Sequence, residues 1–143
     1  MKTIHPSRLL KAALLLDAGI SGATGAVQMG LNAELSGLLR LPPALLLESG
    51  AVMVVWAALL MMLVRATEVA SALIGAVVAG NVGWTLVCVG MAVSGTPTTN
   101  ALGTGFLLLQ AAITLTFACL QLRGLRLSPA ASTAPATRPA GAN

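Results

Sequence analysis

The sequence contains few of the residue types on which soluble proteins and enzymes depend. Charged residues make up 8% of its 143 positions, whereas a soluble domain has about a quarter, and tyrosine is absent. The chain has one histidine, His5, and two cysteines, Cys88 and Cys119. It has no Cys-x-x-Cys motif, no histidine pair and no glycine-rich phosphate loop after a strand. These absences argue against an enzyme, a metal or cofactor site and a nucleic-acid-binding module.

Hydrophobic residues, in contrast, make up 57% of the chain, and its mean hydropathy is +0.91. A helix that crosses a membrane needs about 20 mostly apolar residues. The sequence has four such stretches, at 9–31, 44–64, 69–93 and 101–122. We therefore expect an all-α integral membrane protein, with a four-helix up-down bundle as its single domain at 1–127. The last segment, 128–143, is rich in alanine, proline, serine and threonine and is predicted to be disordered.

Basic residues predict the orientation of these spans. If both termini lie on one side of the membrane, seven of the eight basic residues share that side, namely Lys2, Arg8, Lys11, Arg65, Arg123, Arg126 and Arg138. Only Arg40 lies opposite. Because positive charge concentrates on the cytoplasmic side, we expect a multi-pass protein of a bacterial inner membrane with both termini in the cytoplasm. The N-terminal pattern also fits a secretory signal, but Asp17 interrupts its apolar core, which favours a retained span.

The connections between the spans are short and rich in turn residues. Residues 31–43 allow a short interfacial helix, which Asn32 could cap and a Pro-Pro pair would end. Thr67 could cap the third span, and Thr99 or Asn100 could cap the fourth. Short connections place consecutive spans side by side.

The first span contains polar residues at a helical spacing. They occur at i, i+4, i+7 and i+11 and therefore share one face: Asp17, Ser21, Thr24 and Gln28. Glycines and alanines between them would let a neighbouring helix approach closely. The fourth span has a mixed polar and aromatic face, made of Gly103, Phe106, Gln110, Thr114, Phe117 and Gln121.

Comparison of depth along the spans predicts two polar layers, because polar groups in lipid need partners. One layer joins Asp17 with Asn81 and Gln110, and the other joins Gln28 with Glu48. Glu48 also lies near the start of its helix, where the helix dipole stabilises a carboxylate. The complete predicted intramembrane polar cluster consists of Asp17, Ser21, Thr24, Gln28, Glu48, Asn81, Trp84 and Gln110.

Other residues have simpler interpretations. Cys88 and Cys119 lie toward opposite ends of their spans, so we expect no disulfide between them. Trp56 and Trp84 lie within spans and are expected to pack in the bundle. His5 lies in a polar segment and is expected to be solvated. In the third span, small residues recur every four positions, which permits close contact with another helix: Ala72, Ala76 and Gly80, and Gly75, Ala79 and Gly83.

Several segments resemble a group of small four-span bacterial inner-membrane proteins of uncharacterised function. They are LLLDAGISGATG, LRLPPALLLESG, GNVGW, GTPTTNALGTGFLLLQA and LQLRGLR. The resemblance implies a four-helix bundle in which Asp17, Asn81, Trp84 and Gln110 match recurring positions of the group, and it implies no particular activity. The chain is also similar, more distantly and in architecture alone, to DoxX-like proteins.

Two functions agree with an acidic residue at membrane depth, which costs about 3 kcal/mol to insert. Asp17 could hydrogen-bond to polar residues of other helices in a structural or accessory subunit of a membrane assembly. It could instead bind protons or cations in a small proton-coupled transporter. The scarcity of aromatic residues and the lack of an internal repeat or broken helix favour the accessory role. The expected partners are the lipid bilayer and either a second copy of the chain or a larger membrane protein.

Overall fold

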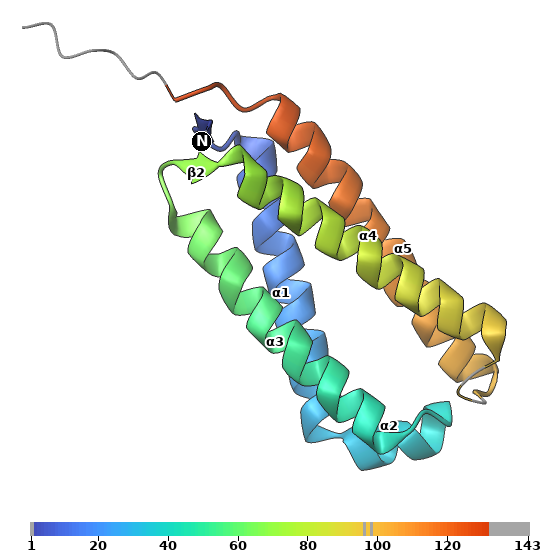
Figure 1. Cartoon of the computed structure of the whole chain (residues 1–143). Helices are drawn as coiled ribbons and strands as arrows, with labels where there is room; N and C mark the ends of the chain where they lie inside the picture. Colours follow the sequence, from blue (N-terminus) through green and yellow to red (C-terminus); the bar gives the residue numbers. More distant parts are fainter. Residues whose placement is uncertain (1, 96, 98, 132–143) are drawn as a thin grey trace, which may run out of the picture.

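The computed structural model describes residues 2–95, 97 and 99–131 of the chain. Four of its helices are long and apolar enough to cross a membrane: α1 (Arg8–Gly30), α3 (Pro43–Arg65), α4 (Ser71–Ser94) and α5 (Ala101–Arg126). A short helix, α2 (Asn32–Leu39), connects α1 to α3. Figure 1 shows the four long helices alternating in direction. The predicted all-α, four-span fold is confirmed, and the chain is a multi-pass membrane protein.

The bundle is closed on three sides and open on the fourth. Helix α1 packs along α3, α4 packs along α5, and contacts between α1 and α5 join the two pairs. Within the described residues, α3 and α4 do not pack closely on one another, although they are consecutive in the chain. In Figure 1, α1 is visible between them. The arrangement therefore leaves a seam between α3 and α4.

Glycine allows the helix backbones to approach most closely in the α1–α3 pair. A Cβ atom added at Gly25 would lie 2.6 Å from the carbonyl oxygen of Gly50, and one added at Gly50 would lie 2.8 Å from the carbonyl oxygen of Gly25. Contacts that short exclude any side chain, so both positions require glycine. Helices α1 and α5 meet similarly, because a Cβ at Gly124 would lie 2.7 Å from the Cα of Leu10.

Backbone pairing joins the two ends of the described part of the chain to each other and to the α3–α4 connection. Strand β1 (Thr3–Ile4) pairs antiparallel with β2 (Val69–Ala70), and the His5 backbone N–H donates to the Pro129 carbonyl at 3.0 Å. The Ala131 backbone N–H donates to the Thr3 carbonyl at 2.9 Å. The prediction of a disordered tail from residue 128 is therefore wrong for 128–131, since the N-terminal strand supplies backbone partners there. Residues 132–143 lie outside the described residues.

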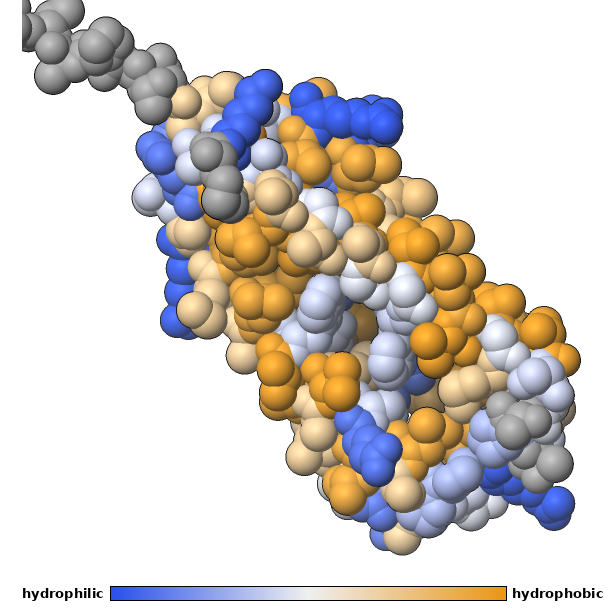
Figure 2. Space-filling view, in the orientation of Figure 1, coloured by the Kyte–Doolittle hydropathy of each residue, from blue (hydrophilic) through white to orange (hydrophobic). Residues whose placement is uncertain are grey.

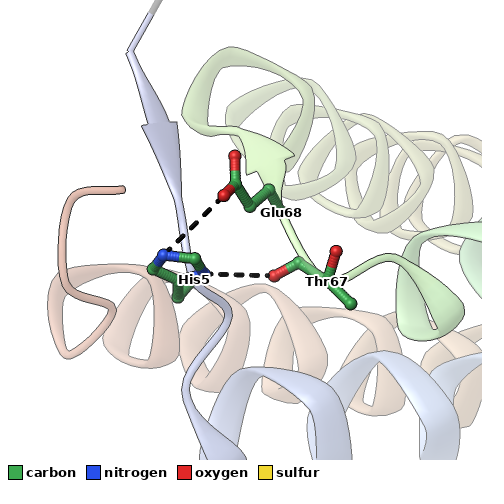
Figure 3. Close-up of polar contacts among 3 residues, drawn as sticks. All are labelled: His5, Thr67 and Glu68. Atoms are coloured by element: carbon green, nitrogen blue, oxygen red, sulfur yellow. Dashed lines mark hydrogen bonds and ion pairs between the residues drawn. The ribbon is translucent and has the colours of Figure 1, made fainter. Parts of the chain in front are cut away.

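The side chain of His5 also contacts the α3–α4 connection at this end of the bundle (Figure 3). Its ring nitrogens lie 3.4 Å from the Thr67 carbonyl oxygen and 3.9 Å from a carboxylate oxygen of Glu68. The His5 side chain remains 52% exposed, so it is solvated as expected while it also contacts the α3–α4 connection.

The helix ends agree in part with the predicted caps. Asn100 caps α5, since its Oδ1 accepts from the Gly103 N–H at 2.8 Å. Asn32 does not cap α2, because its amide instead donates to the Met29 carbonyl at the end of α1, at 3.0 Å. Thr67 does not cap α4, which begins only after the residues of β2. Both ends of the described chain lie at the same end of the bundle (Figure 1), as do the basic residues at the start of α1 and in the last turns of α3 and α5.

Candidate functional site

The polar face of α1 points into the bundle. Asp17 is 0% exposed, Gln28 1% and Ser21 5%, while Thr24 is half-buried. Charged side chains are almost never fully buried unless they are paired. The hydrogen-bond partners of Asp17 therefore decide what this face of α1 can do.

Asp17 accepts three hydrogen bonds, which come from three helices. Ser21 Oγ of α1 donates to Oδ1 at 3.0 Å, and both Asn81 Nδ2 of α4 and Gln121 Nε2 of α5 donate to Oδ2 at 2.7 Å. Asn81 Nδ2 also donates to Gln121 Oε1 at 3.0 Å, which closes the network. We call these four residues the Asp17 cluster. The two carboxylate oxygens of Asp17 thus have partners on three helices.

The Asp17 cluster is complete without any other molecule. Asn81 is 3% exposed and Gln121 is 0% exposed. Within the described residues, no side-chain nitrogen or oxygen atom that is itself fully inaccessible lacks a hydrogen-bond partner. The cluster joins α1, α4 and α5, and α3 contributes nothing to it. It therefore fixes the position of three helices relative to one another.

The predicted first polar layer is correct for Asn81 and wrong for Gln110. Gln121 takes the position beside Asp17 that was predicted for Gln110. The physical reason is the length of α5, which continues to Arg126 and so extends one turn beyond the predicted end at 122. The extra turn moves Gln121 from the helix end into the bundle. The sequence places Gln121 on the same face of the fourth span as Gln110, but the predicted cluster does not include it.

Gln110 forms a separate contact further along α5. Its Oε1 accepts from the indole Nε1 of Trp84 on α4 at 3.2 Å. Between this pair and the Asp17 cluster, the hydroxyls of Thr85 and Thr114 lie 2.9 Å apart. Polar contacts therefore connect α4 and α5 at three levels. Thr85 was missed because a single hydroxyl residue in a long apolar helix gives little signal.

The predicted second layer is correct for Gln28 and wrong for Glu48. Gln28 Oε1 accepts from Ser49 Oγ at 2.7 Å, and its Nε2 lies 3.8 Å from the Met53 sulfur. Glu48 is exposed. Successive residues of a helix point about 100° apart, so Ser49 faces α1 while Glu48 faces away from it. The sequence prediction chose Glu48 as the partner of Gln28 because it is more polar than its neighbour Ser49.

The seam between α3 and α4 forms a groove. Two cavities of about 170 and 230 Å³ adjoin there, and both have Val52 and Trp84 in their walls. We call them together the α3–α4 groove, which Figure 2 shows as a hollow in the middle of the molecule. Ser21 and Asn81 line the first cavity, but Asp17 lines neither cavity. Two members of the cluster are therefore accessible from the groove, and the carboxylate is not.

Trp56 partly covers the groove from α3. A Cβ atom added at Gly80 of α4 would lie 2.5 Å from its indole ring, so the ring lies directly against that helix. This agrees with the packing role predicted for Trp56.

Cys88 is buried, Cys119 is exposed and both are free, so the expectation of no disulfide is confirmed. In the part of the chain that the structure describes, no group of three His, Cys, Asp or Glu residues could hold a metal ion.

Comparisons with protein-family models, with curated proteins and with solved structures find no match for this chain. The resemblance to small four-span and DoxX-like proteins therefore stays a prediction. The function has to be inferred from the geometry of the Asp17 cluster and the α3–α4 groove.

Proposed function

We propose that this chain is a structural or accessory component of a membrane assembly in a bacterial inner membrane, with both termini in the cytoplasm. The observation that supports this role most directly is the environment of Asp17. It is 0% exposed, lines neither cavity and accepts three hydrogen bonds. A carboxylate that moves protons or cations needs access to water, whereas one that holds helices together needs only donors.

An exposed face of α4 supports association with another membrane protein. Gly75, Ala79 and Gly83 are exposed, and a Cβ atom at either glycine would have no neighbour within 4 Å. Small residues at this spacing allow a second helix to pack closely in a membrane. Larger exposed side chains, Val82 and Leu86, border these small residues, so a second helix would approach most closely at Gly75, Ala79 and Gly83.

The face on α4 can be tested by co-purification from native membranes. Gly83→Leu would place a large side chain on the face, and Val89→Leu changes another exposed position of the same helix as a matched control. We expect Gly83→Leu to lose the partner or the second copy, and Val89→Leu to retain it. Equal recovery with both variants would contradict the use of this face.

The groove provides one reason to consider transport as the alternative function. Ser21 and Asn81 line its first cavity and donate directly to Asp17. Rotation of either side chain would open a path from the groove to the carboxylate. A proton-coupled transporter would use that path, with Asp17 as the proton-binding group.

The two functions separate when the carboxylate is moved to another helix. Asp17→Asn leaves one acceptor oxygen for the Asn81 and Gln121 amides and turns its NH2 group toward the Ser21 hydroxyl. Hydrogen bonds to a carboxylate are then replaced by weaker ones to an amide, so we expect a lower yield of folded protein. The double variant Asp17→Asn with Asn81→Asp returns a carboxylate to the cluster, with the Gln121 amide turned over. We expect the double variant to recover much of the folded protein and its partner.

Proton flux into liposomes, followed with a pH-sensitive dye, completes the test. The accessory role predicts no flux above empty liposomes for the wild type or for either variant. Flux in the wild type, together with a normally folded Asp17→Asn protein that conducts no protons, would favour transport and contradict our proposal.

A further inference from the structure

Three of the four tryptophan and phenylalanine residues of this chain line the α3–α4 groove. The sequence contains two tryptophans, two phenylalanines and no tyrosine. Trp56 and Trp84 line the first cavity, and Trp84 and Phe106 line the second. Aromatic walls are typical of sites that bind apolar or cationic small molecules. Packing against Gly80 of α4 accounts for Trp56, whereas Trp84 and Phe106 line the wall of the second cavity.

Two polar groups in the second cavity lack partners. Gln110 is 8% exposed, and its Oε1 accepts from Trp84, but its Nε2 donates to no other described residue. Glu48 lines the same cavity, and its carboxylate has neither an ion pair nor a hydrogen bond among the described residues. An exposed carboxylate without a partner is free to pair with a cation. A positively charged group bound in the groove would form a charge-assisted pair with it.

We propose that the α3–α4 groove binds one lipophilic organic cation, an ammonium group attached to a single alkyl chain. The ammonium group pairs with Glu48, beside the rings of Trp84 and Phe106 that line the same cavity. The alkyl chain follows α3 past Val52 to Trp56. Glu48 and Trp56 are eight residues apart in the sequence, which corresponds to about 12 Å along a helix and to the length of an extended undecyl chain.

The charge and size of the groove select this ligand among membrane amphiphiles. Neither cavity has a lysine or arginine in its wall, so a phosphate group beside Glu48 would be repelled. Cavities of about 170 and 230 Å³ accommodate one alkyl chain better than the two chains of a phospholipid. This site does not involve Asp17, and it goes beyond the accessory role proposed above.

The two tryptophans provide the measurement, because both lie in the groove. A bromine atom quenches indole fluorescence on contact, so we would titrate the protein in neutral-lipid nanodiscs with 11-bromoundecylamine and with the uncharged 11-bromoundecanol. We expect quenching by the amine to saturate, at a concentration about tenfold lower than for the alcohol. Glu48→Gln should abolish that tenfold preference. Glu34→Gln removes an exposed acid on α2 that lines neither cavity, so it should retain the preference.

A further variant tests the direction in which the chain lies. Trp84→Phe leaves Trp56 as the only indole, and quenching by the bromine at the chain end should persist. Loss of quenching in this variant would contradict the proposed direction. Equal quenching by the amine and the alcohol, or a tenfold preference that survives in Glu48→Gln, would overturn the cation site. Absence of quenching by either reagent would mean that a second copy or another protein covers the groove, and it too would overturn the proposal.

Discussion

The close contact between α1 and α3 predicts a large difference between two glycine substitutions in the same helix. A Cβ atom at Gly25 would lie 2.6 Å from the Gly50 carbonyl oxygen and 3.1 Å from the Met53 Cβ. A Cβ atom at Gly19 would have no neighbour within 4 Å. Gly25→Ala must therefore push α1 away from α3, whereas Gly19→Ala fills open space on the lipid-facing surface.

The expected magnitude follows from two terms. Replacing glycine by alanine in a helix favours the helix by about 0.8–1 kcal/mol at either site, so this term cancels when the two variants are compared. Overpacking against a rigid neighbour costs about 1–3 kcal/mol, and it applies to Gly25 only because its neighbour is backbone. We expect the free energy of unfolding of Gly25→Ala to be about 2 kcal/mol lower than that of Gly19→Ala.

Reversible unfolding in mixed micelles, with increasing sodium dodecyl sulfate, measures this difference by circular dichroism. Gly50→Ala should behave like Gly25→Ala, because a Cβ there would lie 2.8 Å from the Gly25 carbonyl oxygen. If Gly25→Ala and Gly19→Ala differed by less than about 0.5 kcal/mol, the backbone contact would not hold the two helices together, and the packing described above would be refuted.

Three further predictions concern single side chains. Ser49→Ala removes the 2.7 Å hydrogen bond to Gln28, so the free energy of unfolding in mixed micelles should fall by about 0.6 kcal/mol, and an unchanged value would contradict that contact. Asn100→Ala removes the cap of α5, which should cost about 1 kcal/mol in the same assay, and an unchanged free energy of unfolding would contradict the cap. A maleimide should label exposed Cys119 in detergent and label buried Cys88 only after denaturation, and equal labelling of the native protein would contradict the orientation of α4.

The four spans could be predicted because each is a long apolar run bounded by turn or basic residues, and lipid permits few alternatives to a helix. The pairing of β1 with β2 could not be predicted. Each strand is two residues long, and the pairing depends on chain ends and a connection that are far apart in the sequence. The open seam was also unpredictable, because composition alone does not show which neighbouring helices stay apart.

The Asp17 cluster was predictable in part, since an acid in an apolar helix must have partners. Gln121 could have been identified from spacing: Gln110, Thr114, Phe117 and Gln121 follow the same i, i+4, i+7 and i+11 pattern as the polar face of α1. When two such faces meet in antiparallel helices, the first position of one lies near the last position of the other. That rule pairs Asp17 with Gln121, as the structure does.

The most direct test of the account is a double-mutant cycle between Asp17 and Gln121. The variants Asp17→Ala, Gln121→Ala and their combination would be unfolded in mixed micelles, with Asp17 and Gln110 as a control pair that makes no contact. We predict a coupling energy of about 1.5 kcal/mol for Asp17 with Gln121, near the upper end for hydrogen bonds between membrane helices. The control pair should couple by less than about 0.3 kcal/mol. A coupling that small between Asp17 and Gln121 would contradict the claim that Asp17 holds the bundle together.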